Sequence, residues 1–537
     1  MIVHQCEKAG RGFPPLRRRW LLWLLCVLFP VATDAHVGSP NVFFEGKAGP
    51  YPVHVVIRPP EVIPGLAEIS VRVETPGIQK VTALPIKWNA GRKGAPPPDV
   101  ARRVSGETNL YSAELWFMET GAQSIEIEVT GVSGRGRVTV PVDAVASRVM
   151  TMPKSLGGIL AVLGVVLVAM LSSIIGAAVR ESVLDPGEQP TERRHWRARG
   201  ATVFAAILFA LLLWGGKRWW DGNAADYRNN RLYRPMTASA EVRSEKGQRI
   251  LRLEVTDQRF TYSPPLVPDH GKLMHLFLVR EPKLDAFAHL HPIKRDRKTF
   301  ETRLPVLPTG RYRLYADVTY ETGLSDTLTT TVEVPELPPV FESKGASIPS
   351  DADDSWRIDS SLNTTATREC PLGGQTTMTW AAPQSLVPNQ PVRLRFLVRD
   401  AGDHPVVLEP YLGMPGHLAL RREDGSVFTH LHPGGSPSMA AMQLSSLRTE
   451  GKIKLDAAWG KEDPLCQLPA LSAGEREWLR GPSTTEGSTV TFPYAFPRPG
   501  RYRLWVQVKV KGEILTGVYD VDVQKLEAKS RHLEARG

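Results

Sequence analysis

The chain has 537 residues, of which 42% are hydrophobic and 23% charged, and it carries a formal net charge of +10. This length suggests about three or four domains, and the composition excludes a disordered or collagen-like chain. Residues 1–35, 180–199, 217–234 and 525–537 carry +3, +1, +3 and +2, so nine of the ten net charges lie in short flanking segments. The expected folded domains are almost neutral, and we therefore expect no nucleic-acid partner.

The N-terminal segment has the pattern of a secretory signal. Three arginines at 17–19 precede an apolar run over residues 20–31 and a small-residue segment that ends at Ala35. We predict a signal peptide over 1–35 with cleavage after Ala35. The alternative is an uncleaved signal anchor, although the apolar run is short for a membrane span. Both interpretations predict export.

Two later segments have the composition of transmembrane helices. Residues 155–179 contain no charged side chain, and residues 200–216 are a shorter apolar run followed by basic residues and tryptophans that suit a membrane interface. We predict two transmembrane helices, joined by a cytoplasmic loop over 180–199. The small-residue pair Ser172 and Gly176 suits helix packing. The expected protein is a multi-pass protein of the cell inner membrane, with the lipid bilayer as a partner and its folded domains in the periplasm.

Outside these spans, short alternating apolar segments broken by proline and glycine are typical of antiparallel sandwiches. The predicted fold class is mainly β, with three extracytoplasmic immunoglobulin-like β-sandwich domains and two transmembrane α-helices. The predicted boundaries are 36–150, 235–336 and 367–524 for the sandwiches, 337–366 for an acidic linker, and 525–537 for a charged tail.

The second and third of these domains resemble each other in sequence. The matched segments keep their order along the chain, which indicates a duplicated unit with insertions in the later copy. The pairs are 266–268 with 386–388, 277–280 with 396–399, 288–292 (AHLHP) with 429–433 (THLHP), and 309–315 with 499–505.

The repeated His-x-His-Pro motif is the strongest indication of chemistry. Alternate residues of a strand share a face about 6.5–7 Å apart, so His289 with His291, and His430 with His432, can direct two imidazoles at one ion. Imidazole suits copper, zinc and nickel, and a thioether narrows the choice toward Cu(I). Further candidate ligands lie nearby: Met414, His417, Met439 and Met442 in the third domain, and His275, with Met274 and His270, in the second.

An alternative interpretation of these residues remains open. Histidines beside a turn can cap backbone groups or pack in a core, and Met439 and Met442 can fill a core from a short helix.

The motifs at 408–418 and 427–433, with 499–507, resemble the bacterial periplasmic modules grouped as YtkA-like or heavy-metal-associated sandwich domains. The resemblance covers most of residues 380–524 and the shorter copy at 260–335. It implies an immunoglobulin-like fold and an association with copper-handling proteins. It also implies that Gly413, Gly416, His417, His430 and His432 correspond to the site of such modules, whereas the second domain has Met274-His275 in place of the Gly-x-x-Gly-His turn.

Two further expectations concern single residues. If cleavage makes His36 the first residue, its amine and imidazole can chelate Cu(II) with His54 as a third ligand, which resembles the N-terminal histidine of CopC-type copper carriers. After cleavage, Cys370 and Cys466 are the two remaining cysteines, and outside the membrane we expect them to form a disulfide rather than a thiolate metal or redox pair.

The sequence contains no Gly-x-Ser-x-Gly, His-Glu-x-x-His, phosphate-loop or dinucleotide motif, so we expect a binding protein rather than an enzyme. We predict a membrane-anchored periplasmic protein whose function is the binding, relay or homeostasis of copper or another soft divalent metal. Its expected partners are copper-transport or oxidase-assembly proteins. The alternative is a structural or assembly module that presents tandem sandwiches to an envelope protein.

Overall fold

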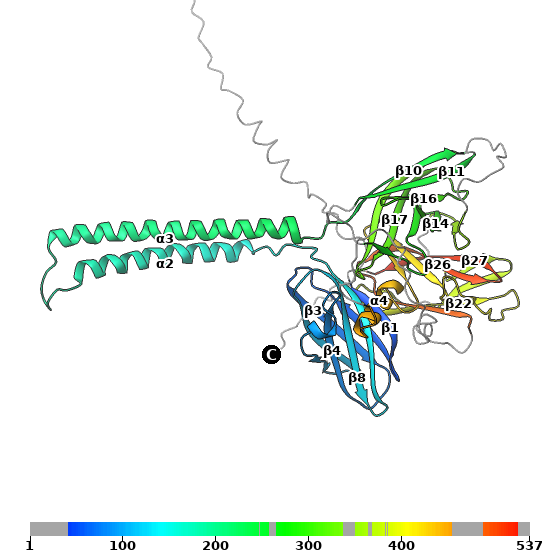
Figure 1. Ribbon diagram of the computed structural model, residues 1–537, viewed down its shortest axis with the longest axis horizontal. Helices are drawn as coiled ribbons and strands as arrows, with labels where there is room; N and C mark the ends of the chain where they lie inside the picture. Colours follow the sequence, from blue (N-terminus) through cyan, green and yellow to red (C-terminus); the bar gives the residue numbers. More distant parts are fainter. Residues whose placement is uncertain are drawn as a thin grey trace, which may run out of the picture. The chain divides into compact units, whose positions relative to one another are not determined.

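The computed structural model describes residues 41–245, 247–256, 265–336, 350–362, 368–381, 383, 385–453 and 487–524. These residues form a mainly β structure with two long apolar helices, as predicted (Figure 1). Six sheets pair around three hydrophobic cores, and we call the three pairs the first, second and third sandwich.

Buried and more exposed residues alternate along the strands of the first sandwich, as expected when one face of a sheet is in contact with solvent. In β2, every second residue from Tyr51 to Ile57 is buried, because alternate side chains point to opposite faces of a sheet. One sheet has the order β1 (Val42–Ala48), β2 (Tyr51–Arg58), β3 (Gly65–Val73), β7 (Leu110–Phe117), β6 (Arg102–Arg103). The other has the order β5 (Asp99–Val100), β4 (Ile78–Lys87), β8 (Gly121–Gly131), β9 (Gly134–Ala144), and a short 3-10 helix η1 spans Arg92–Gly94.

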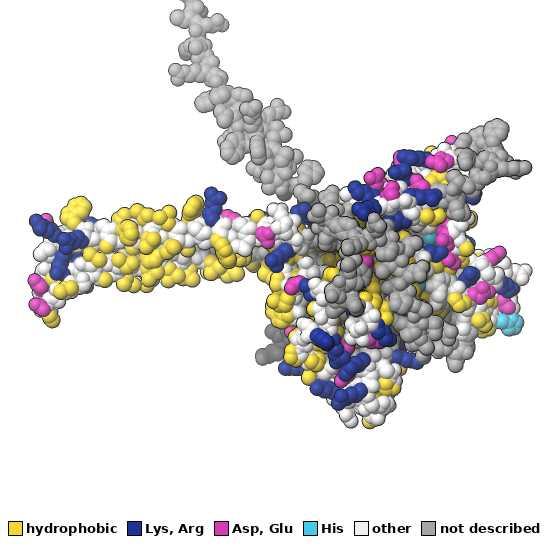
Figure 2. Space-filling model, viewed as in Figure 1, with side chains coloured by type: hydrophobic (Ala, Val, Ile, Leu, Met, Phe, Trp, Pro, Cys, Tyr) yellow, Lys and Arg dark blue, Asp and Glu magenta, His cyan; other side chains and the backbone are white. Residues whose placement is uncertain are grey.

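Two long helices follow the first sandwich, α2 (Lys154–Glu181) and α3 (Glu192–Asp226), and a π-helical turn η2 (Tyr227–Arg231) ends the second. Both are long and apolar enough to cross a membrane. Their apolar side chains are exposed along the middle of the pair, and charged side chains gather near its ends (Figure 2). Small residues mediate their packing: Ser172 and Gly176 are buried on α2, and a Cβ on Gly176 would meet Thr202 Oγ1 at 2.1 Å.

The second sandwich has one sheet in the order β10 (Thr237–Glu245), β11 (Gln248–Thr256), β16 (Thr299–Arg303), β15 (Ile293–Lys294). The other has the order β12 (Leu266–Val267), β17 (Gly310–Tyr320), β13 (His275–Arg280), β14 (Ala286–Leu290), β19 (Ser355–Ile358), with β18 (Ser325–Val334) also on β17. Strand β19 lies within the segment predicted to be a linker. It extends this sheet because its residues pair with β14 from Ala286 to His289.

The third sandwich has one sheet in the order β20 (Glu369–Gly373), β21 (Thr376–Trp380), β22 (Val392–Arg399), β25 (Thr489–Tyr494). The other has the order β24 (Phe428–Leu431), β23 (His417–Arg422), β26 (Gly500–Val510), β27 (Glu513–Val523), and helix α4 (Met439–Thr449) follows β24.

The duplicated strands correspond differently from the predicted alignment. Strand β13 lies between β14 and β17, and β23 lies between β24 and β26, so β23 is the counterpart of β13. The similar sequence at 396–399 belongs to β22, in the opposite sheet of the third sandwich. His275 is therefore the counterpart of His417, since each opens its strand.

Candidate metal centre

Seven histidines converge where the second and third sandwiches meet. We call this set the histidine cluster: His270, His275, His289, His291, His417, His430 and His432. His275 and His289 come from the second sandwich. Their ring centroids lie 5.5 and 5.7 Å, respectively, from the ring centroid of His430 in the third sandwich. The sequence predicted a separate site in each sandwich, whereas the structure joins the two sets.

The strands that carry these histidines are buried on both faces, which explains the convergence. In β13, Leu276 and Leu278 enter the core of the second sandwich, so His275 and Phe277 point the other way. The same alternation directs His417 and Ala419 of β23 outward from the third sandwich. The outward faces of the two sheets pack against each other and enclose the histidines.

Aromatic pairs beside the cluster hold the two sheets together in a pseudo-twofold arrangement. Phe287 of β14 stacks on Trp505 of β26 at 4.8 Å, and the counterpart pair, Phe428 of β24 and Tyr315 of β17, stacks at 3.9 Å. The two pairs are therefore equivalent: each joins a phenylalanine on β14 or β24 of one sandwich to an aromatic ring on β26 or β17 of the other. Arg421 Nε adds a hydrogen bond to Tyr315 Oη at 2.7 Å.

Two groups of three histidines are close enough to hold an ion. Ring nitrogens of His275, His289 and His291 lie within 4.8 Å of one another, and so do those of His270, His417 and His432. We call these the first and second triads. The first triad belongs to the second sandwich alone. The second requires both sandwiches, because His270 comes from the second and the other two from the third.

Outer hydrogen bonds fix which nitrogen of several rings carries the proton. His291 Nδ1 lies 3.1 Å from Asp354 Oδ1, His432 Nδ1 lies 3.1 Å from the carbonyl of Pro437, and His275 Nε2 lies 3.2 Å from the carbonyl of Asp269. A carbonyl or an ionised carboxylate can only accept, so these histidine nitrogens donate. In a neutral ring the other nitrogen then carries a lone pair, which is the arrangement of metal-ligating histidines with their outer partners.

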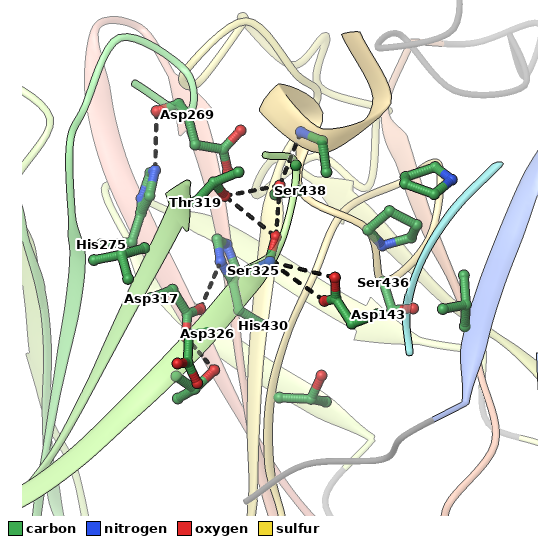
Figure 3. Close-up of a pocket in the computed structure, with 18 of the residues that line it drawn as sticks. Asp143, Asp269, His275, Asp317, Thr319, Ser325, Asp326, His430, Ser436 and Ser438 are labelled. Carbon is green, nitrogen blue, oxygen red and sulfur yellow. Dashed lines mark hydrogen bonds and ion pairs between the residues drawn. The ribbon is translucent and has the colours of Figure 1, made fainter. Parts of the chain in front are cut away.

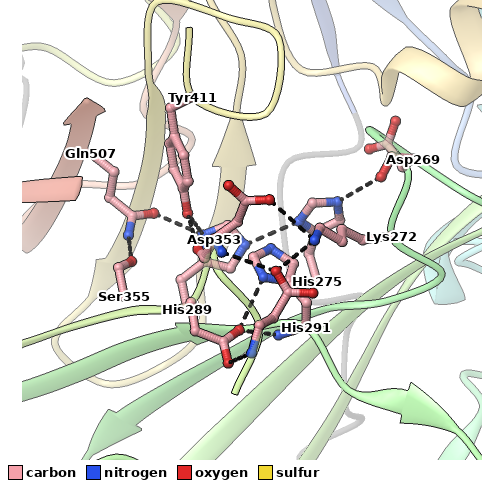
Figure 4. Close-up of polar contacts among 11 residues, drawn as sticks. Asp269, Lys272, His275, His289, His291, Asp353, Ser355, Tyr411 and Gln507 are labelled. Carbon is pink, nitrogen blue, oxygen red and sulfur yellow. Dashed lines mark hydrogen bonds and ion pairs between the residues drawn. The ribbon is translucent and has the colours of Figure 1, made fainter. Parts of the chain in front are cut away.

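The same pattern continues in two further rings. His430 Nδ1 lies 3.4 Å from Asp317 Oδ2 (Figure 3), and His289 Nδ1 lies 2.9 Å from Gln507 Oε1 (Figure 4). Gln507 is itself oriented by Ser355, to which its amide nitrogen donates. The opposite nitrogen, His289 Nε2, lies 3.0 Å from His275 Nδ1.

Several inward nitrogens have no hydrogen-bond partner among the described residues. They are His291 Nε2, His430 Nε2, His432 Nε2 and both ring nitrogens of His270 and of His417. Leaving a buried polar atom unpaired costs about 1–3 kcal/mol, so a cluster of this kind is costly unless something else satisfies it. A metal ion would take these lone pairs.

Burial also keeps the rings in the form that a metal needs. It lowers the pKa of His270 and His275, and it lowers the pKa of the other five histidines well below the usual value. Except at His270, neighbouring histidines lower these values further, because the rings would repel one another if charged. Neutral imidazole is the ligand form.

His270, which the sequence offered only as a further candidate near His275, is a member of the second triad. It lies in a turn from Asp269 to Lys272, closed by two backbone hydrogen bonds of 2.9 Å, with φ of 52° at His270 and 80° at Gly271. The turn from Tyr411 to Met414 has the same form, with φ of 51° and 81° at its centre. Each turn places its second residue five positions before the histidine that opens β13 or β23, a spacing that identifies His270 as the counterpart of Leu412.

The other predicted residues have different places. Met414 is buried in the turn before β23, close in sequence to His417, and Met439 begins α4. Met442 of α4 packs in the core of the first sandwich, in keeping with the alternative interpretation that it fills a core from a short helix. His54 lies on the first sandwich, where its Nε2 contacts Glu74 Oε1 at 2.7 Å, and its expected role as a third ligand beside His36 stays a prediction.

Two predictions fall partly or wholly outside the described residues. These residues include neither His36 nor the signal segment, so the N-terminal chelate stays a prediction. Cys370 is buried, and its Sγ accepts a hydrogen bond from the backbone N–H of Val518 at 3.3 Å. Its expected disulfide partner, Cys466, lies outside the described residues.

Comparisons with known proteins add little to this geometry. Residues 236–336, 372–459 and 466–525 match a family described as a domain of unknown function (DUF8832), and these segments include all seven histidines. The curated proteins include no significant match.

Solved structures resemble the chain only distantly. A tetra-tandem repeat in the extending region of a large adhesion protein is 8% identical, with a TM-score of 0.14 over 86% of this chain and 71% of that one. Latent PorU from Porphyromonas gingivalis is 8% identical, with a TM-score of 0.13 over 90% of this chain and 34% of that one. A protein from Corynebacterium diphtheriae named as a putative membrane-anchored protein is 10% identical, with a TM-score of 0.13 over 91% of this chain and 97% of that one.

Proposed function

We propose that this protein binds transition-metal ions, copper foremost, in the histidine cluster between the second and third sandwiches. The observation that carries the proposal is the set of unpaired inward nitrogens. Those of His291, His430 and His432 lie on rings whose other nitrogen is held by an outer acceptor. His291 with Asp354 and His432 with the Pro437 carbonyl are the clearest cases. Packing alone would not leave these nitrogens unpaired.

The donor set favours copper among the metals that imidazole binds. Both triads offer nitrogen only, which suits copper, zinc and nickel, and affinity among divalent ions is highest for copper. An imidazole nitrogen lies about 2.0–2.1 Å from a bound zinc ion. The ring nitrogens of each triad must approach a bound ion to about this distance. We propose one ion per triad.

The helices α2 and α3 supply the cellular setting of this proposal. Their exposed apolar length supports two membrane spans, and the predicted export signal supports a periplasmic location for all three sandwiches at the inner membrane. The protein would then hold copper at the membrane surface for relay to transport or oxidase-assembly proteins.

X-ray absorption of the copper-loaded full chain in detergent tests the ligand set. We expect a first shell of imidazole nitrogens, with multiple scattering from histidine rings, and a reduced histidine signal in His417→Gln. His404, an exposed histidine of the third sandwich, provides the control variant His404→Gln. A first shell of oxygen alone, or a spectrum unchanged in His417→Gln, would exclude this site.

A further inference from the structure

A pocket opens beside the histidine cluster where all three sandwiches meet. Its volume is about 150 Å³, and we call it the entry pocket (Figure 3). Strands β1 and β9 of the first sandwich, β17 and β18 of the second, and the segment from β24 to α4 of the third contribute its walls. His275, His430 and His432 line it, so it reaches rings of both sandwiches.

The entry pocket is negatively charged. Its lining includes Asp143, Asp269, Asp317 and Asp326, and the described residues that line it include no lysine or arginine. The carboxylates are held in place: Asp143 accepts from the Ser325 N–H at 3.3–3.4 Å, and Asp317 accepts from Thr327 Oγ1 at 2.6 Å. A cleft lined by one sign of charge attracts counter-ions and raises their association rate.

Unpaired histidine nitrogens connect this charge to the cluster. His430 and His432 line the entry pocket with side chains more than nine-tenths buried, and neither Nε2 has a hydrogen-bond partner among the described residues. The hydroxyls of Thr319, Ser325 and Ser438 lie 2.9–3.3 Å from one another on the same wall. The lining therefore offers a cation both hydroxyl oxygens and imidazole nitrogens.

Strand β1 of the first sandwich packs closely against the loop that follows His432. Phe43 N donates to Ser436 Oγ at 3.0 Å, and Ser436 N donates to the Phe43 carbonyl at 2.9 Å. A Cβ on Gly435 would approach the Phe43 carbonyl oxygen to 1.9 Å, so only glycine allows β1 to approach the loop after His432 so closely. This contact fixes β1 beside the entry pocket, which Asn41 and Val42 line.

We propose that the entry pocket is the port through which a metal cation enters and leaves the histidine cluster, with Asp143 as the contribution of the first sandwich. This inference rests on the proposed metal-binding function. It also explains why a sandwich without a histidine in the cluster packs against the site.

Stopped-flow mixing of the metal-free full chain in detergent with Cu²⁺, followed by quenching of tryptophan fluorescence, tests the port. Burial raises the pKa of Asp143 to about 8, so at neutral pH this carboxyl is mostly protonated and releases its proton to solvent as the cation arrives, which an amide cannot do. We therefore expect Asp143→Asn to lower the association rate constant about tenfold at low ionic strength. The dissociation rate constant should fall in parallel, because a port is used in both directions, so Kd changes far less than either rate. Asp99→Asn, at an exposed position on the same sandwich, should match the wild type.

A second measurement needs no variant. The wild-type association rate should fall as NaCl is raised from 10 to 200 mM, because salt screens the pocket charge. An association rate that is insensitive to salt, or equal in Asp143→Asn and wild type, would overturn the port while equilibrium binding of Cu²⁺ still supported the cluster. Absence of Cu²⁺ binding by the wild type would overturn both proposals.

Discussion

His275 Nδ1 lies 3.0 Å from His289 Nε2, while the opposite nitrogens of the two rings contact the Asp269 carbonyl and Gln507 Oε1. Both outer partners are acceptors, so in two neutral rings the inner nitrogens would present lone pairs to each other. Either a shared proton or a metal ion must relieve this contact. Burial lowers the pKa of both histidines, which disfavours the proton and favours the metal.

The outer partners of the rings should matter almost as much as the rings themselves. We expect Asp354→Asn to weaken copper binding by about 10- to 100-fold, because the amide no longer holds His291 as a carboxylate does. Competition with a chromophoric copper chelator measures the change. Asp403→Asn, at an exposed carboxylate of the third sandwich, is the control and should leave the affinity unchanged. Equal affinities in both variants would remove Asp354 from the site.

The metal-free protein should lose stability in acid. Unfolded histidines take up protons below about pH 6.5, whereas burial and neighbouring rings lower the pKa of the folded ones, so stability falls as pH drops below that value. Buried carboxylates oppose this trend. Burial raises the pKa of Asp143 to about 8 and that of Asp317 and Asp354 to about 6, so the folded state binds protons there that the unfolded state releases.

The seven histidines outnumber these carboxylates, and we expect a lower Tm at pH 5 than at pH 7.5. Asp143→Asn removes one opposing group and should steepen the loss. Thermal denaturation followed by circular dichroism checks both expectations. A Tm that rises on acidification would show that the rings accept protons in the folded protein.

The stacked aromatic pairs should couple folding to metal binding. Trp505→Ala should cost about 3–5 kcal/mol of unfolding free energy, because it removes a fully buried indole stacked on Phe287. It should also weaken binding at the second triad, whose members come from both sandwiches. Denaturant unfolding and copper titration measure these effects. Trp356→Ala is the control, since Trp356 is half exposed and its loss should change stability by less than about 0.5 kcal/mol. Unchanged copper affinity at the second triad in Trp505→Ala would show that this aromatic contact does not affect metal binding.

Local pattern was sufficient to predict the strands, the two helices and the pairing of histidines on one face. His289 and His291 do share a face, as period-two alternation requires, with ring centroids 4.7 Å apart. The joining of the two sets was not predicted, because alternation does not identify what an outward face packs against. The signal was present in the apolar residues between the histidines: Phe277, Phe287 and Phe428 share their faces with His275, His289 and His430, and a solvent-exposed face would not carry such rings.

Sequence similarity also misled the alignment of the repeat. The shared letters at 277–280 and 396–399 hid the relation between His275 and His417, which follows from strand order and from the five-residue spacing to each preceding turn. The sequence offered His270 only as a neighbour of His275, because it lies in a turn, where no strand periodicity applies. Tertiary packing, rather than local propensity, brings it to His417 and His432.

The most direct test is a copper titration of the full chain in detergent that compares the wild type, His404→Ala and a double variant, His291→Ala with His417→Ala, which removes one ring from each triad. Circular dichroism of each metal-free protein establishes that it is folded. We expect the wild type and His404→Ala to bind two copper ions tightly, and the double variant to lose both sites, with affinities lower by more than about 100-fold. Equal and weak binding by all three proteins would contradict the assignment of the histidine cluster as a metal centre.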